Sequence, residues 1–129
     1  DLRQDPRRQN AMVTQLIMPY GDTLRRLIAR GGKVVAGTDS PIIPPGISLH
    51  TEIQNFVEGG LTPFQALQTA TVWAAEALGA KEDLGTIEPG KLADLVIIDG
   101  DPLSDIRATW NIHTVIKNGK TYRLDDLLR

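Results

Sequence analysis

Lys33-Val34-Val35-Ala36-Gly37-Thr38-Asp39-Ser40 is the stretch of sequence that decides the fold. Its apolar residues are consecutive, and no polar residue alternates with them. Such a run predicts a strand of a parallel sheet that is covered on both faces. A helix is expected just before it, with Asp22 as N-cap and Gly31-Gly32 as its end. The helix and the strand together predict one unit of an α/β fold.

Helices are expected on the C-terminal side of this strand. Residues 41–47 contain three prolines and predict a stiff loop. Ser48 is then expected to begin a helix that ends at Glu58. Thr62-Pro63-Phe64-Gln65 is a typical helix start, with Thr as N-cap, Pro in the first turn and Gln in a capping box. Another helix is expected to begin at Thr71.

The pattern changes to antiparallel β-structure after Gly79. Residues 93–99 predict a strand, and residues 114–122 predict a β-hairpin around Asn118-Gly119, which suits a type I′ turn. The expected parallel strand at 33–37 has no obvious neighbour in this chain, and one strand cannot form a sheet. The chain is therefore expected to be a piece of a larger fold.

The composition excludes several classes of protein. The chain has 129 residues and a net charge of −2, from 14 Lys+Arg and 16 Asp+Glu, so no nucleic-acid partner is expected. Without cysteine there is no disulfide scaffold or thiolate site. No run reaches the roughly 18 apolar residues of a membrane span. The first residues do not resemble a signal peptide, so the cytoplasm is the default compartment, although a longer parent could be exported.

Asp39 is the first candidate for chemistry. It follows the C-terminal end of the expected buried strand, where α/β active sites are built. Its carboxylate could bind a divalent metal or accept a proton from a metal-bound water. Gly37 before it would let backbone or ligand approach closely. The local pattern fits equally well a capping aspartate whose side chain is satisfied by nearby amides.

His50 is the second candidate, in the first turn of the expected helix 48–58. The positive end of the helix dipole disfavours a charged imidazole there, so a neutral ring could accept a hydrogen bond or contact a ligand. The alternative is a half-buried histidine at the edge of the apolar stripe. His113 begins the hairpin and is expected to be structural.

An ordered set of motifs runs through most of the chain, and it extends over about residues 24–123. The motifs are Gly37-Thr38-Asp39, residues 46–52, residues 60–67, Ala70-Thr71, residues 84–97, residues 100–103 and residues 115–120. In this order they resemble the C-terminal portion of the metal-dependent amidohydrolase superfamily, in the branch that includes imidazolonepropionase-like and prolidase-like enzymes.

The resemblance implies a composite fold. Residues 1–79 would be the last strand and helices of a (β/α)8 TIM barrel, and residues 80–129 the C-terminal strands of a small β-sandwich domain. Asp39 would be the aspartate of the eighth barrel strand, serving as metal ligand and catalytic residue. His50 matches a histidine of the segment that follows this strand and is expected to contact substrate.

The resemblance also implies an activity for the complete protein. It would hydrolyse a C–N bond, in a non-peptide or dipeptide amide, with a small-molecule amide as substrate and a divalent metal, expected to be zinc. The family's His-x-His pair, bridging Lys and further His ligands have no positions in this sequence. A catalytic zinc needs about three protein ligands and a water, so the isolated chain is expected to hold no metal and to be inactive.

A non-catalytic module is the alternative. In that case the strands after Gly79 and the exposed edges of strand 33–37 would serve assembly, as a strand-paired or domain-swapped homo-oligomer. An incomplete barrel would leave unpaired edges and uncovered helix faces. The chain is therefore expected either to self-associate or to require a missing N-terminal portion.

Overall fold

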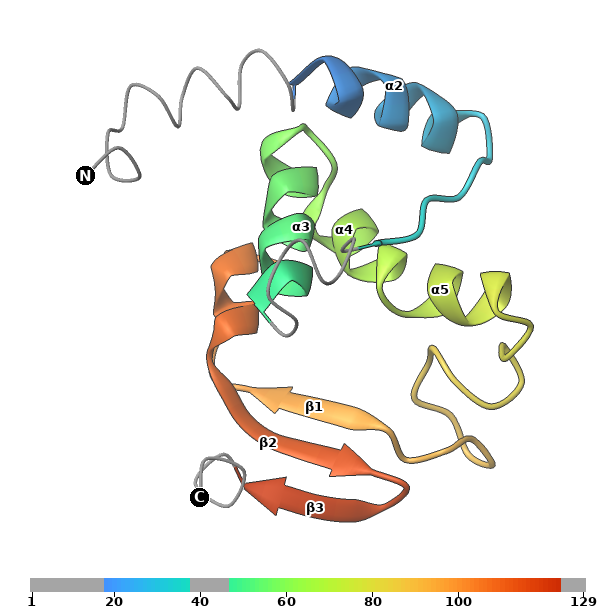
Figure 1. Ribbon diagram of the computed structural model, residues 1–129, viewed down its shortest axis with the longest axis vertical. Coiled ribbons are helices and arrows are strands. Elements are labelled where there is room, and N and C mark those ends of the chain that lie inside the picture. Colours follow the sequence, from blue (N-terminus) through green and yellow to red (C-terminus); the bar gives the residue numbers. More distant parts are fainter. Residues whose placement is uncertain (1–17, 38–46, 124–129) are drawn as a thin grey trace.

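The computed structural model describes residues 18–37 and 47–123, and it places a group of helices above a small antiparallel sheet (Figure 1). The elements in chain order are α2 (Met18–Ala29), α3 (Ile47–Glu58), α4 (Pro63–Thr69), α5 (Val72–Ala77), β1 (Leu95–Ile98), the 3-10 helix η2 (Ile106–Trp110), β2 (Ile112–Lys117) and β3 (Lys120–Arg123). None of the helices within these two ranges is long and apolar enough to cross a membrane.

Helix α2 begins earlier than the sequence pattern predicts. Asp22 was expected as its N-cap, but the helix starts at Met18, so Asp22 lies within it. Its carboxylate instead pairs with Arg25 at 3.0 Å and Arg26 at 2.8 Å, on the next turn. A proline is compatible with the first helical turn, because the first amides have no partner inside the helix, and Pro19 therefore does not break α2. The helix ends as predicted, and Gly31 has a positive φ of 82°.

The expected buried strand at residues 33–37 is not formed. Within the described part of the chain this segment joins no sheet, and the side chain of Val35 is 43% exposed. The backbone N–H of Ala36 donates to the carbonyl of Thr69, at the end of α4, at 3.1 Å. A parallel strand needs strands beside it, and the only described sheet is the antiparallel one.

Helices α3 and α4 enclose the small core with η2. Ile53, Ala66 and Ile106 are its buried residues, and the partly buried side chains around them are Phe56, Val57, Leu67 and Ala70. The capping box predicted for α4 is confirmed in both halves. Thr62 Oγ1 accepts the N–H of Gln65 at 3.2 Å, and the Gln65 side chain accepts the N–H of Thr62 at 3.0 Å.

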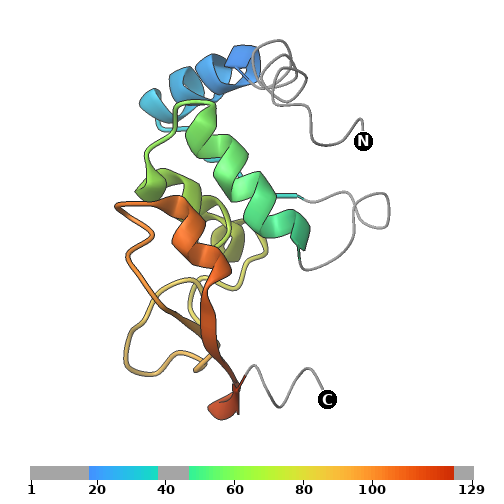
Figure 2. The same ribbon diagram turned by 90° about the vertical axis from the view of Figure 1, so that its left-hand side faces the viewer.

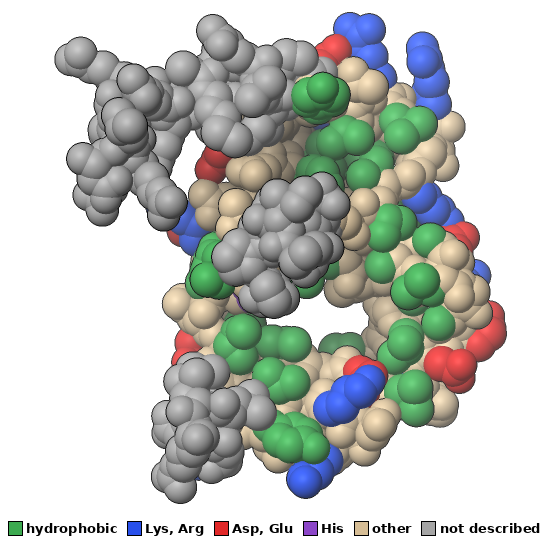
Figure 3. All heavy atoms as spheres, viewed as in Figure 1, with side chains coloured by type: hydrophobic (Ala, Val, Ile, Leu, Met, Phe, Trp, Pro, Cys, Tyr) green, Lys and Arg blue, Asp and Glu red, His purple; other side chains and the backbone are tan. Residues whose placement is uncertain are grey.

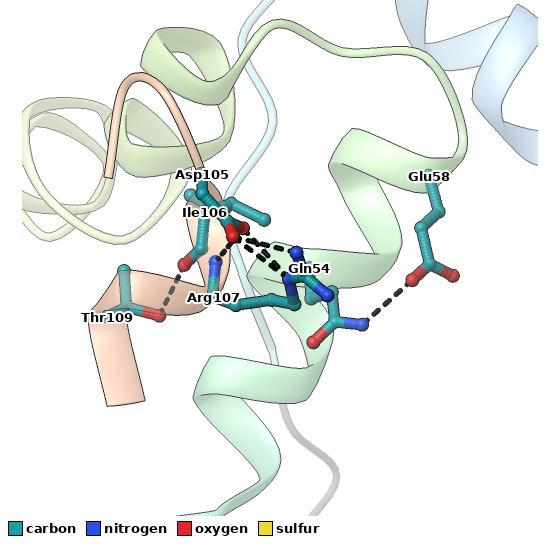
Figure 4. A network of polar contacts seen from close by, with 6 residues as sticks. All are labelled: Gln54, Glu58, Asp105, Ile106, Arg107 and Thr109. Atoms are coloured by element: carbon teal, nitrogen blue, oxygen red, sulfur yellow. Dashed lines mark hydrogen bonds and ion pairs between the residues drawn. The ribbon is translucent and has the colours of Figure 1, made fainter. Parts of the chain in front are cut away.

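Helix η2 was not expected from the sequence, and it lies against α3 (Figures 2 and 4). Asp105 caps it by accepting the N–H of Arg107 at 3.0 Å, and the same carboxylate binds the Arg107 guanidinium through two nitrogens. Thr109 Oγ1 donates to the carbonyl of Ile106 at 2.9 Å. This short helix carries Ile106 into the core and Trp110 to the side of α3.

The C-terminal elements form the antiparallel sheet that the sequence predicts. The strand order is β1-β2-β3, with Val115 of β2 opposite Val96 of β1 and Tyr122 of β3. The predicted type I′ turn is confirmed, since Asn118 and Gly119 have φ values of 50° and 75°.

Candidate functional site

Ala36 and Gly37 are hydrogen-bonded to two different helices, α4 and α3. The Gly37 N–H donates to Oε1 of Glu52, on α3, at 3.0 Å. The preceding amide, that of Ala36, is bound by Thr69 of α4. A Cβ placed on Gly37 would meet nothing within 4 Å, so no described atom requires a glycine here for close approach.

Glu52 is a half-buried carboxylate with one oxygen in use. Burial raises its pKa above the ordinary value for glutamate, and the hydrogen bond from the Gly37 N–H opposes that rise. Its second oxygen, Oε2, is buried and has no hydrogen-bond partner among the residues described. This oxygen could therefore accept one further hydrogen bond.

His50 lies one half-turn before Glu52 on α3, and its ring packs against Trp110. The two ring centroids are 5.1 Å apart, with an angle of 34° between the planes. Burial lowers the pKa of His50 below its ordinary value, which favours the neutral form of the imidazole. A neutral ring was expected, but from the helix dipole, whereas desolvation is the cause found here. Nδ1 is buried and finds no partner within residues 18–37 and 47–123.

Asp39 lies outside the described residues, and its role stays a prediction. His113 is an exposed residue of β2, and its Nδ1 is 2.8 Å from Thr114 Oγ1. In the two described ranges no three His, Cys, Asp or Glu side chains are grouped closely enough to hold a metal ion. The donor set of this part of the chain does not by itself fit a metal centre.

An apolar groove of about 670 Å³ separates the helices from the sheet. Figure 3 shows an opening in this region, with hydrophobic side chains along part of its border. Its walls come from α3, α4 and α5, from the loop at residues 84–92 and from β1, with His50 on the helical side. On β1, Val96 is 57% and Ile97 47% exposed. Apolar surface of this extent usually contacts another chain segment, a partner or a ligand.

Glu52 and Trp110 are the residues that sequence reasoning missed. The bond from Gly37 to Glu52 joins residues fifteen positions apart and belongs to no local motif. Trp110 depends on η2, for which the one local signal is Asp105 in the N-cap position. His50 lies on a helix, as the sequence suggested, and its ring contacts Trp110.

The comparison with known proteins identifies the class of protein. The profile of the Amidohydrolase family matches residues 20–122, which is most of the chain. This chain therefore belongs to the amidohydrolase family, and the resemblance found in the ordered motifs is confirmed.

Individual relatives agree with this assignment. Imidazolonepropionase of Geobacillus kaustophilus (strain HTA426) is 39% identical over 109 residues, which are 81% of this chain and 26% of that protein. A crystal structure of a Xaa-Pro dipeptidase with bound methionine has a TM-score of 0.72 and 38% identity, over 80% of this chain and 25% of the other. The crystal structure of phenylurea hydrolase B has a TM-score of 0.70 and 32% identity, over 84% of this chain and 27% of the other. The chain spans about a quarter of the length of these relatives.

Proposed function

We propose that this chain is the C-terminal part of a metal-dependent hydrolase that cleaves a C–N bond in a small amide. Family membership over residues 20–122 is the observation that carries the proposal. The relatives named above include a Xaa-Pro dipeptidase and a phenylurea hydrolase, whose names denote dipeptide and urea substrates. A non-peptide or dipeptide amide is therefore the substrate class that suits this chain best.

In this proposal residues 1–79 supply the last strand and helices of a (β/α)8 barrel, and residues 80–129 supply C-terminal strands of a small sandwich. Two features of the chain support the division. Segment 33–37 lacks strand neighbours in the described ranges, as expected for a barrel strand separated from its barrel. The apolar groove and the exposed Val96 and Ile97 indicate surface that other segments of the parent would cover.

Asp39 is the carboxylate that this chain contributes to the active site, and His50, eleven residues further along the chain, is a substrate-contacting residue. The donor set of the described residues does not hold a metal, so the other ligands of the expected zinc would come from the rest of the parent. On this proposal the isolated chain neither binds zinc stoichiometrically nor turns over an amide.

The test of Asp39 uses the complete protein that contains this chain. Asp39→Asn keeps the size of the side chain and removes its charge. We expect turnover of a Xaa-Pro dipeptide or a phenylurea to fall roughly 100-fold or more, with the circular-dichroism spectrum unchanged. Asp83→Asn, which neutralises an exposed aspartate, is the matched control and should retain activity. Near-normal rates in Asp39→Asn would remove Asp39 from the active site.

An assembly module is the second candidate function. It is favoured by the free outer edges of β1 and β3 and by the apolar residues exposed on β1, within the described sheet. Such a module would pair its strands with a second copy. Light scattering on the 129-residue chain over a range of concentrations distinguishes the cases, since a concentration-independent monomer contradicts this second function.

A further inference from the structure

The turn between β2 and β3 contains the one Asn-Gly pair of the sequence, Asn118-Gly119. Both residues are exposed, and beyond its chain neighbours no atom lies within 4 Å of a Cβ placed on Gly119. Since glycine has no side chain, its backbone nitrogen is open to approach by the side-chain amide of the residue before it. This pair is therefore the place where an asparagine side chain of the chain reacts most readily with its own backbone.

The reaction that this pair allows is deamidation. The Gly119 nitrogen attacks Cγ of Asn118 and forms a new N–C bond, while the side-chain NH2 group leaves as ammonia with the proton of the Gly119 N–H. Water then opens the resulting succinimide ring at either carbonyl and gives aspartate or isoaspartate. Asparagine and one water thus become an acid and ammonia, and no oxidant or further reactant is needed. Because the attacking nitrogen must give up its proton, a contact that holds this N–H slows the reaction.

Two hydrogen bonds hold this turn against the residues that precede β1. The Gly119 N–H donates to the carbonyl of Ala93 at 3.0 Å, and the Asn118 N–H donates to Oδ1 of Asp94 at 2.7 Å. The Asp94 carboxylate also pairs with Lys117, and its side chain is 18% exposed. The attacking nitrogen is therefore occupied as long as the turn stays bound to Ala93 and Asp94.

We propose that Asn118 is a site of spontaneous deamidation, and that release of the turn from Ala93 and Asp94 limits its rate. The proposal is independent of the hydrolase function, because it uses only the β2–β3 turn and the two residues before β1. Isoaspartate lengthens the backbone by one carbon atom within a turn that pairs Lys117 with Lys120. Either product also brings a new negative charge close to Asp94. Both changes oppose binding of the turn, so the modified turn stays released.

The site is tested by peptide mapping of the 129-residue chain after incubation in mildly alkaline buffer. Mass spectrometry detects the exchange of the amide for a carboxyl group, and an isoaspartate methyltransferase labels the isoaspartate. We expect conversion at Asn118 before Asn55 and Asn111, which precede bulky residues and serve as internal references. Equal conversion of the three would overturn the proposal. So would an unchanged Asn118 under conditions that convert a synthetic peptide of residues 115–121.

The role of the two contacts is tested by variants of Asp94. Asp94→Ala removes the acceptor of the Asn118 N–H and should speed deamidation about tenfold, as loss of a hydrogen bond to a charged group implies. Asp94→Asn keeps an oxygen that accepts the same hydrogen bond, so its rate should stay closer to that of the unchanged chain. Asp99→Ala removes an exposed aspartate just after β1 and is the matched control, for which we expect no change.

A second variant distinguishes local release of the turn from a general loss of stability. Thr62→Ala removes the capping box of α4 and changes no residue of the sheet. The rate at Asn118 should be unchanged in Thr62→Ala as long as circular dichroism shows a folded chain, because opening of the turn is a local event. Equal acceleration in Thr62→Ala and Asp94→Ala would mean that global unfolding limits the rate. That result, or an unchanged rate in Asp94→Ala, would overturn the proposal.

Discussion

Gly85 and Gly90 form a natural pair for testing how the loop after α5 packs. Their φ values are nearly equal, 92° and 93°, so the positive φ penalises alanine at both positions. Only Gly85 is enclosed. A Cβ there would lie 2.8 Å from Ala75 Cβ and 2.9 Å from Val72 Cα, whereas at Gly90 it would meet nothing within 4 Å. The difference between the two variants therefore isolates close packing against α5.

The expected magnitudes follow from these contacts. A non-glycine residue at such a positive φ costs about 1–3 kcal/mol, which applies to Gly85→Ala and Gly90→Ala alike. Overpacking adds about 1–3 kcal/mol at Gly85 alone. The neighbours cannot move aside cheaply, because one is a backbone atom and the other a Cβ fixed to its helix. Gly85→Ala should therefore lose about 1–3 kcal/mol more free energy of unfolding than Gly90→Ala.

The assay is urea unfolding of the two variants and the parent chain, followed by circular dichroism. A lower midpoint for Gly85→Ala than for Gly90→Ala, at equal m-values, is the predicted result. Equal midpoints would refute the reasoning, because they would mean that residue 85 does not pack on Val72 and Ala75. The described packing of the loop at residue 85 against α5 would then be incorrect.

Three further predictions concern single residues. Thr62→Ala removes the capping box of α4 and should lower the free energy of unfolding by about 1 kcal/mol, measured against the exposed control Thr121→Ala. The hydrogen bond from the Asn118 N–H, and after it Lys117, lower the pKa of Asp94 in the folded chain. The ionised Asp94 carboxylate therefore stabilises the fold above its unfolded-state pKa of about 3.9, and this stabilisation is lost as the pH falls through the folded-state pKa. Asp94→Asn should therefore weaken the acid dependence of unfolding below about pH 4. An NMR titration should give a pKa below 6.5 for His50, and a pKa above 6.5 would contradict the burial of its ring.

Local chemistry made two features of the fold predictable. The capping box at Thr62 and the turn at Asn118-Gly119 act within a few residues, and both are found where the sequence places them. The strand expected at residues 33–37 failed for a non-local reason. A continuous apolar run of this kind is typical of a strand that lies between other strands and is covered on both faces of the sheet. The described part of the chain supplies no strand to pair with it.

The candidate site was predictable only in part. The sequence placed His50 on a helix and favoured a neutral ring; burial lowers the pKa of His50, which favours the same form, and its ring contacts Trp110. Glu52 could not be found from spacing, because its contact with Gly37 exists only after α3 has packed. Asp39 stays a prediction that rests on sequence order and on the family.

The most direct test measures metal content and amide turnover together, on the purified 129-residue chain and on the complete protein. It asks whether this chain supplies only one part of the hydrolytic active site. The predicted result is stoichiometric zinc and turnover in the complete protein, with neither in the chain alone. Tight stoichiometric zinc together with turnover in the 129-residue chain would contradict it.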